Sequence, residues 1–208
     1  MSCPRCGIAS SPATAVCASC GFSVAAIDER LGTHAVIINR LVDTQHLLRL
    51  RDSSRLEAQL DEFERRFPQA FCTVFLGVLP GGVSAGEGGF WLLNHGVRTC
   101  QDVVRPNSHG IAIVIDPSTH EASLSMGYAL EVIIPAAKAG ELLRKVSPAL
   151  WHGDHARAIA KLVAGLDSLL RKHGQARTRP PLTGARKPRS LFGFERTVPD
   201  KTQVEVEK

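Results

Sequence analysis

The most constraining segment of the sequence is Gly110-Ile111-Ala112-Ile113-Val114-Ile115-Asp116, in which every residue between the two ends is apolar. A strand that is apolar on both sides is usually covered on both faces, so this run predicts a central strand between helices. Asp116-Pro117-Ser118-Thr119-His120 has the composition of a turn. Beyond it Ala122, Leu124 and Met126 alternate with polar residues. The two strands should therefore form a hairpin.

The residues before this hairpin predict further layers. Residues 71–79 form a second apolar run, typical of another buried strand, and residues 35–38 predict a short buried strand. Between them, the segment from about 45 to 67 repeats Leu and Phe at helical spacing. Pro68 should end this helix.

Two more helices close the globular part of the chain. One should start at Pro135; the other should have Asp154 as its N-cap and stop at Gly174. Residues 80–89 are rich in glycine but lack the Lys-Ser/Thr ending of a phosphate-binding loop, so they predict a flexible connection into the apolar stretch 90–94. The element order is β-α-β-α-β-β-α-α, which indicates an α/β layered sandwich with a roughly four-stranded sheet between helices.

Two knuckles at the N-terminus share one pattern, Cys3-Pro4-Arg5-Cys6-Gly7 and Cys17-Ala18-Ser19-Cys20-Gly21. A tetrahedral Zn²⁺ site needs four ligands, and each Cys-x-x-Cys turn presents two thiolates to one ion. The glycine that closes each knuckle can adopt the positive φ of such a turn. The pattern predicts a structural zinc ribbon bound by Cys3, Cys6, Cys17 and Cys20.

The alternative for these cysteines is a pair of redox-active Cys-x-x-Cys motifs. It is less favoured, because a thioredoxin-like motif stands at a strand–helix junction, whereas a Ser/Ala-rich loop separates these pairs. The other two cysteines, Cys72 and Cys100, do not suggest a disulfide framework. With no visible signal peptide and no apolar run long enough to span a bilayer, we expect a cytoplasmic protein.

The net charge of +5 over 208 residues belongs to the C-terminal end. From Arg171 onward ten basic residues stand against four acidic ones, a net charge of +6. This end is also rich in proline, so residues 174–208 predict a disordered basic tail. We expect it to act mainly by charge, on an acidic partner or nucleic acid. Its one apolar cluster, Leu191-Phe192-Gly193-Phe194, could dock on a partner or on the folded body.

Several segments between Leu41 and about Leu170 follow a known family pattern. They are Leu41-Val42-Asp43 before an amphipathic helix, Phe90-Trp91-Leu92-Leu93-Asn94, Ser108-His109-Gly110 before the central strand, and Ser125-Met126-Gly127-Tyr128-Ala129-Leu130-Glu131. The chain thereby resembles the TPM domain family, named after its plant thylakoid, photosystem II repair and nematode receptor-modulator members. The resemblance implies a four-stranded sheet between helices.

The family resemblance also implies a second site, with departures. Members credited with phosphatase activity or Ca²⁺/Mg²⁺ binding carry acidic residues at the ends of these strands. Here Ser108 and His109 stand where the family has aspartate and asparagine, while Asp43 and Glu131 match as a residual metal or phosphate site. Two matched acids fall short of the six or more oxygen ligands that such a cation prefers.

These observations predict three regions: a zinc ribbon at 1–25, a TPM-like α/β domain at 33–173 and a basic tail at 174–208. The favoured function is a non-enzymatic, cytoplasmic binding or accessory module with a protein partner. One alternative is a divalent-metal-dependent phosphatase of TPM type, with Ca²⁺ or Mg²⁺ as cofactor. Another is a zinc-ribbon protein associated with nucleic acid.

Overall fold

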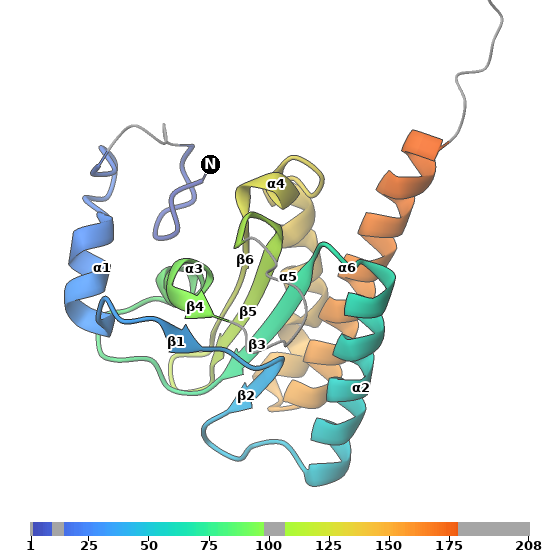
Figure 1. The fold of residues 1–208 in the computed structure, drawn as a ribbon. Coiled ribbons are helices and arrows are strands. Elements are labelled where there is room, and N and C mark those ends of the chain that lie inside the picture. The colour runs from blue at the N-terminus through green and yellow to red at the C-terminus, as the bar shows by residue number, and fades with distance from the viewer. Residues whose placement is uncertain (1, 10–14, 98–106, 179–208) are drawn as a thin grey trace, which may run out of the picture.

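The computed structural model describes residues 2–9, 15–97 and 107–178 (Figure 1). Its centre is a four-stranded sheet with the order β2-β3-β5-β6. The strands are β2 (Leu41–Asp43), β3 (Phe71–Leu76), β5 (Gly110–Asp116) and β6 (Glu121–Met126). The first three run parallel, and β6 is antiparallel to β5. The sheet is therefore mixed, with β2 and β6 at its edges.

The hairpin predicted from the central segment is confirmed. Residues of β5 and β6 pair in one register from Ile111 opposite Met126 to Asp116 opposite Glu121. In the connecting turn the buried Asp116 carboxylate accepts the N–H and the hydroxyl of Ser118. Burial raises the pKa of Asp116, but these bonds outweigh it and leave the pKa below its ordinary value.

Helices cover both faces of the sheet, as the sequence predicts. One face carries α2 (Leu50–Arg66), α5 (Ala136–Trp151) and α6 (His155–Thr178), and the other carries α3 (Ala85–His95) (Figure 1). Strand alternation sorts the core between the two faces. Ile111, Ile113 and Ile115 join the large cluster with α2 and α6, whereas Ala112 packs with Leu93 of α3.

The first strand lies elsewhere than predicted. Residues 35–38 contribute only β1 (Val36–Ile37), which pairs in parallel with β4 (Gly96–Val97) in a separate two-stranded sheet. Ile37 is 68% exposed, so this segment is not a buried strand of the main sheet. The first strand of the main sheet is β2, which is too short to show a periodicity of its own.

The prediction that residues 80–89 form a flexible connection was wrong for the second half of that segment. Helix α3 begins at Ala85 and includes Gly86, Gly88 and Gly89. Ser84 is its N-cap and accepts the N–H of Glu87, whose carboxylate in turn accepts the N–H of Ser84. This reciprocal capping box initiates a helix despite the glycines.

The glycines of α3 permit close packing on both sides of the helix. A Cβ at Gly89 would overlap the Ser125 hydroxyl of β6, and one at Gly86 would overlap the carbonyl oxygen of Pro4 in the first knuckle. Their low helix propensity is therefore offset by contacts that larger residues would prevent.

Two predicted helix boundaries also differ. Helix α2 begins at Leu50 and not near residue 45, because the Asp43 carboxylate accepts the N–H groups of Leu47 and Leu48 and holds a turn there. Helix α6 continues through Gly174 to Thr178. One glycine in a helix costs only about 1 kcal/mol, which the rest of a long helix can offset.

The remaining elements are short: α1 (Val24–Leu31), the 3₁₀ turn η1 (Asn107–His109) and α4 (Tyr128–Glu131). Across the part of the chain that the structure describes, no helix is both long and apolar enough to cross a membrane. The predictions for Cys100 and for the tail from residue 179 onward lie outside the described residues.

Candidate metal centre

Each Cys-x-x-Cys segment forms a tight knuckle whose backbone closes on itself. The N–H of Gly7 donates to the carbonyl of Cys3 at 2.9 Å, and that of Gly21 donates to the carbonyl of Cys17 at 2.8 Å. Both glycines have positive φ, 73° and 70°, as the sequence predicts. This conformation turns both side chains of a knuckle toward the same point.

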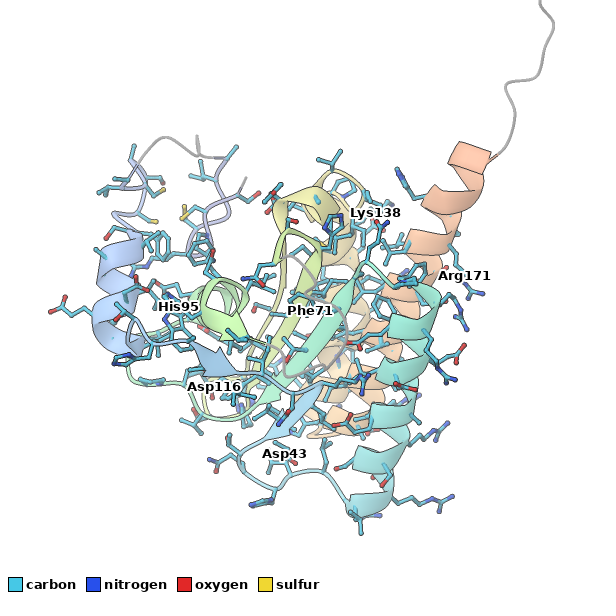
Figure 2. All side chains as sticks on the ribbon, viewed as in Figure 1. Asp43, Phe71, His95, Asp116, Lys138 and Arg171 are labelled. Carbon is cyan, nitrogen blue, oxygen red and sulfur yellow. The ribbon has the colours of Figure 1, made fainter. Side chains whose placement is uncertain are left out.

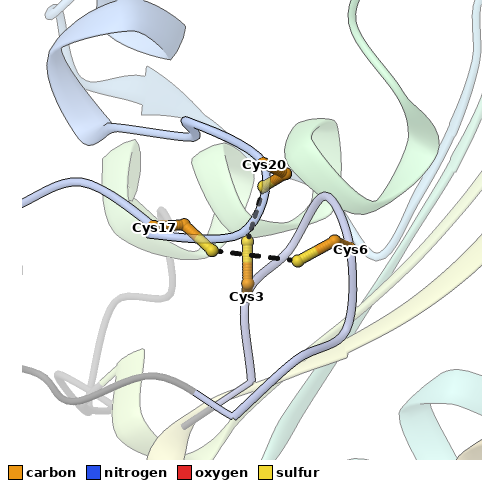
Figure 3. Close-up of side chains that lie close together, drawn as sticks. All are labelled: Cys3, Cys6, Cys17 and Cys20. Carbon is orange, nitrogen blue, oxygen red and sulfur yellow. Dashed lines mark hydrogen bonds between the residues drawn. The ribbon is translucent and has the colours of Figure 1, made fainter.

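The knuckles bring all four thiols into one cluster (Figure 3). The four Sγ atoms lie within 4.8 Å of one another. The Sγ atoms of Cys3 and Cys20 are 3.6 Å apart and those of Cys6 and Cys17 are 3.8 Å apart. A tetrahedron of thiolates 2.3 Å from a central ion has edges of about 3.8 Å. The cluster therefore has the size of a four-thiolate metal site and is far too open for disulfides.

Electrostatics within the cluster favour a bound cation. The N–H groups of Cys20 and Ser19 donate to the Cys17 thiol and lower its pKa to about 6. The N–H of Phe22 lowers the pKa of Cys20, but burial and the neighbouring thiols outweigh it and raise that pKa to about 12. Four sulfurs this close cannot all ionise unaided, whereas a cation stabilises every thiolate at once. The four cysteines could thus hold a metal ion.

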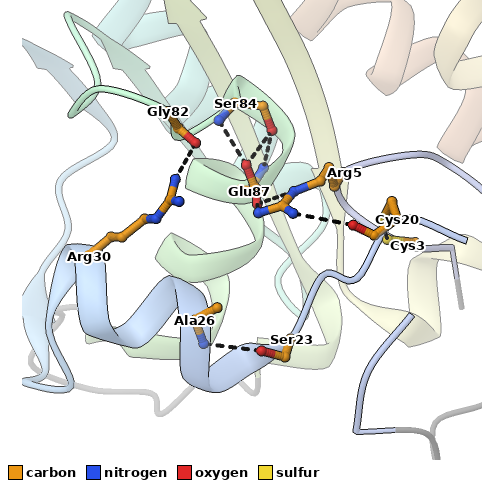
Figure 4. Close-up of polar contacts among 9 residues, drawn as sticks. All are labelled: Cys3, Arg5, Cys20, Ser23, Ala26, Arg30, Gly82, Ser84 and Glu87. Carbon is orange, nitrogen blue, oxygen red and sulfur yellow. Dashed lines mark hydrogen bonds and ion pairs between the residues drawn. The ribbon is translucent and has the colours of Figure 1, made fainter. Parts of the chain in front are cut away.

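An ion pair fixes the first knuckle to the domain behind it (Figure 4). The Arg5 Nε donates to Glu87 Oε1 at 2.8 Å, and Arg5 Nη2 lies 2.6 Å from the same oxygen. Glu87 is only 2% exposed. Burial raises the pKa of Glu87, but the Ser84 N–H and the Arg5 guanidinium outweigh it and leave the pKa below its usual value. Glu87 therefore both caps α3 and binds the first knuckle.

Apolar contacts reinforce this joint. Buried residues of the N-terminal segment, Cys3, Cys17, Phe22 and Ile27, form one cluster with Val83 and Trp91. The Trp91 indole N–H also donates to the carbonyl of Gly32, at 2.8 Å. The cysteine cluster is therefore packed on α3 and is not an appendage on a loose linker.

Sequence reasoning did not identify Arg5 and Glu87 as joint residues. The Ser84-x-x-Glu87 spacing is a capping-box signature that could have located the start of α3. No local pattern, however, shows that Arg5 would reach a glutamate 82 residues away.

The two acids matched by the family resemblance lie apart. Asp43 ends β2 beside Leu76, at the sheet end where β5 finishes, and its carboxylate caps the turn before α2 (Figure 2). Glu131 lies in α4, just after Gly127, whose N–H bonds to Gly110 at the start of β5. Asp43 and Glu131 are thus at opposite ends of the sheet.

The departures from the family pattern cluster at the Glu131 end. Ser108 and His109 are in η1, directly before β5, and the Ser108 hydroxyl lies 3.1 Å from His109 Nδ1. A Cβ at Gly127 would overlap the Ser108 backbone, so this turn is close to the start of α4. The described side chains here offer one carboxylate, from Glu131, with a hydroxyl and an imidazole.

Solved structures similar to this fold include two domains determined by NMR. The N-terminal domain of a protein from P. gingivalis has a TM-score of 0.49 and 14% identity, and the match covers 64% of this chain and 82% of that one. The N-terminal domain of the cg2496 protein from Corynebacterium glutamicum has a TM-score of 0.48 and 14% identity, covering 62% of this chain and 78% of that one.

No curated protein matches the chain. The family model for the TPM domain matches residues 41–169, from the start of β2 into α6. This range includes the whole four-stranded sheet and the helices that cover both of its faces, and it leaves the cysteine knuckles outside. By this match over more than half its length, the chain belongs to the TPM domain family.

Proposed function

We propose that the protein is a non-enzymatic, cytoplasmic binding or accessory module in which a structural zinc ribbon is fixed onto a TPM domain. The observation that carries this proposal is the joint between them. Arg5 of the first knuckle pairs with the buried Glu87 of α3, and apolar residues of both regions form one cluster. A ribbon attached in this way presents one continuous surface to a partner.

Zinc is the ion that fits the donor set best. Four thiolates with tetrahedral spacing and no oxygen donor are typical of structural Zn²⁺ sites. Cys3, Cys6, Cys17 and Cys20 would fill all four positions, which leaves no position for substrate or water. The ion would therefore stabilise the ribbon and would not take part in hydrolysis.

The positions of the acids favour a binding role over the phosphatase alternative. Ca²⁺ and Mg²⁺ prefer several oxygen ligands in one place. The matched acids Asp43 and Glu131 are at opposite ends of the sheet, and Ser108 with His109 supplies no carboxylate beside Glu131. Asp43 is also already engaged by two backbone N–H groups.

Two measurements on the full-length protein test this proposal. Elemental analysis after expression in zinc-replete medium should give about one zinc per chain. Turnover of an aryl phosphate should show no dependence on added Ca²⁺ or Mg²⁺. Cation-dependent turnover that is abolished by Asp43→Ala or Glu131→Ala would overturn the non-enzymatic assignment, whatever the zinc content.

A partner can be sought with a matched pair of baits. A tagged native chain and the same chain with Cys3→Ser and Cys6→Ser should be compared for co-purifying proteins and nucleic acids. The proposal expects a protein that is retained by the native chain and lost from the cysteine variant. Retention of nucleic acid by both chains equally would instead support the nucleic-acid alternative.

A further inference from the structure

The free edge of the sheet lies in a groove. β6 is one of the two edge strands, and beside it lies a groove of about 580 Å³. One wall comes from the first knuckle and α3, through Pro4 and Phe90, and the other comes from α5, through Ala136, Ala139 and Gly140. The small residues on the α5 wall leave room for large apolar side chains.

The backbone of β6 offers unused hydrogen-bonding groups to this groove. The N–H of Gly127 donates to the carbonyl of Gly110, so in the β5–β6 register the odd-numbered residues of β6 bond to β5. Ala122, Leu124 and Met126 therefore direct their N–H and C=O groups outward. Within the described residues, no hydrogen bond reaches these outward groups. An unpaired edge of this kind accepts an added strand.

The described chain ends beyond the same end of the sheet as α4, where such a strand would enter. α6 starts near the end of β5, where His155 lines a pocket with Asp116, and its 24 residues run about 36 Å toward the other end of the sheet. Figure 1 shows α6 finishing beyond the sheet end at which α4 lies. The twelve residues 179–190 can span about 40 Å when extended, which is slightly more than the length of α6.

We propose that Leu191-Phe192-Gly193-Phe194 docks in this groove within the same chain, as a fifth strand antiparallel to β6. A chain that enters at the α4 end and runs toward Ala122 is antiparallel, since β6 ends at Met126 near α4. Alternation puts Phe192 and Phe194 on one face of the added strand, and Ala139 and Gly140 on the α5 wall accommodate them.

Charge favours the same direction of entry. Glu131 lines the α4 end of the groove. In the antiparallel direction Lys187 and Arg189, which precede the apolar cluster, pass this end first. A second copy of β6 would bring another Glu131 to the groove and no basic segment in register with it. The tail is therefore the better occupant.

Single-residue amide exchange of the ¹⁵N-labelled full-length protein tests this docking. The N–H groups of Leu124 and Met126 should exchange about tenfold or more slowly in the wild type than in Phe192→Ser/Phe194→Ser. Those of Ser123 and Ser125 bond to β5 and should be unchanged, which makes them an internal control. Leu182→Ser/Val204→Ser removes two apolar tail residues outside the cluster and should behave as the wild type does.

A variant in the groove tests the same docking without any change to the tail. A Cβ at Gly140 meets nothing within 4 Å, so Gly140→Leu should fold, fill the groove and accelerate exchange of Leu124 and Met126 as the double tail variant does. Gly140→Ala is its control and should retain protection. Equal exchange in the wild type and the Phe192/Phe194 variant would overturn the proposal. Protection that increases with protein concentration would also overturn it, because pairing within one chain does not depend on concentration.

Discussion

The predicted ribbon, of which the structure describes residues 2–9 and 15–25, meets the TPM domain at α3, and the two regions differ in the residues that they bury. The domain buries a continuous apolar cluster that includes Leu60, Phe63 and Leu162, each fully buried. The described part of the ribbon has two isolated β-bridges, Ser2 with Ala9 and Val16 with Ser23, and its buried residues are Cys3, Cys17 and Phe22. We therefore expect the domain to fold by burying apolar surface, and the ribbon to depend on what its thiolates bind.

This difference predicts which changes should affect the stability of each region. A structural zinc site contributes on the order of 10 kcal/mol or more to folding of its own segment, so ribbon stability should follow metal content. The large core cluster of the domain contains no ribbon residue, so the stability of the domain should not depend on metal content. Changes at the joint, which includes Gly86, Glu87 and Trp91, should affect the coupling of the two regions.

The largest effect is expected from Cys3→Ser with Cys6→Ser. Removing two of four ligands should reduce the zinc content from about one per chain to none and unfold the ribbon. The domain should still unfold cooperatively on heating. Elemental analysis and thermal unfolding measure both outcomes, and Cys72→Ala, a change in the domain core, should leave the zinc in place. Loss of the cooperative transition in the ribbon variant would contradict independent folding of residues 33–173.

The reverse test is a cavity in the domain. Leu162 is fully buried, so Leu162→Ala should lower the free energy of unfolding by about 3–5 kcal/mol. Denaturant unfolding measures this loss, and zinc stoichiometry of the folded protein should be unchanged. Leu50→Ala is the matched control, because Leu50 is 84% exposed and should change stability by less than about 0.5 kcal/mol. A Leu162 variant that folds but binds no zinc would show that the ribbon requires an intact domain core.

Much of this fold could be predicted from the sequence because its signals are local. The β5–β6 hairpin follows from one apolar run, a turn and an alternating strand, and the thiol cluster follows from two knuckles with a glycine at the same place. The packing of Leu56, Leu60 and Phe63 in α2 follows from helical spacing.

The remaining features depend on contacts between distant residues. Gly86, Gly88 and Gly89 predict a loop because glycine has a low helix propensity. The packing against Pro4 and Ser125 that favours glycine within a helix at this place involves residues distant in the sequence. The separation of Asp43 from Glu131 depends on sheet order, and the pairing of Arg5 with Glu87 on how the ribbon docks. The separation of the two acids and the Arg5–Glu87 pairing have no signature within a short window of sequence, whereas α3 has one in the Ser84-x-x-Glu87 capping box.

A smaller effect is expected from Glu87→Gln, which weakens the joint while glutamine can still form the capping box. The buried carboxylate loses its charge and Arg5 its partner. Because Arg5 is partly exposed, we expect a loss of about 1–2 kcal/mol in docking of the ribbon. The weaker docking should appear as faster transfer of zinc to a chelator and as increased solvent exposure of Trp91. Glu141→Gln, which removes an exposed ion pair with Lys138, should change neither.

The ion pair of Arg5 with Glu87 predicts that the stability of the joint depends on pH. The pKa of Glu87 is lowered in the folded protein, so its contribution to stability is complete above its ordinary value of about 4.5 and is lost as the pH falls through the lower, folded value. Zinc release by acid affects the wild type and Glu87→Gln alike. The stability advantage of the wild type should therefore be constant near neutral pH and should shrink below about 4.5. A constant difference down to pH 3 would show that the charge of Glu87 does not stabilise the joint.

The smallest effects should come from two glycines that differ only in what surrounds them. Gly86 and Gly140 are both helical, and alanine has the higher helix propensity by about 1 kcal/mol. At Gly140 a Cβ meets nothing within 4 Å, so Gly140→Ala should raise the free energy of unfolding by about 0.5–1 kcal/mol and leave zinc transfer unchanged. At Gly86 a Cβ would overlap the Pro4 carbonyl, which belongs to backbone and cannot rotate away. Gly86→Ala should therefore displace the first knuckle, accelerate zinc transfer to a chelator and cost about 1 kcal/mol or more. If both variants were stabilised equally, the knuckle would not be held against α3 in solution, and the joint between ribbon and domain would be looser than the contacts of Pro4 and Arg5 imply.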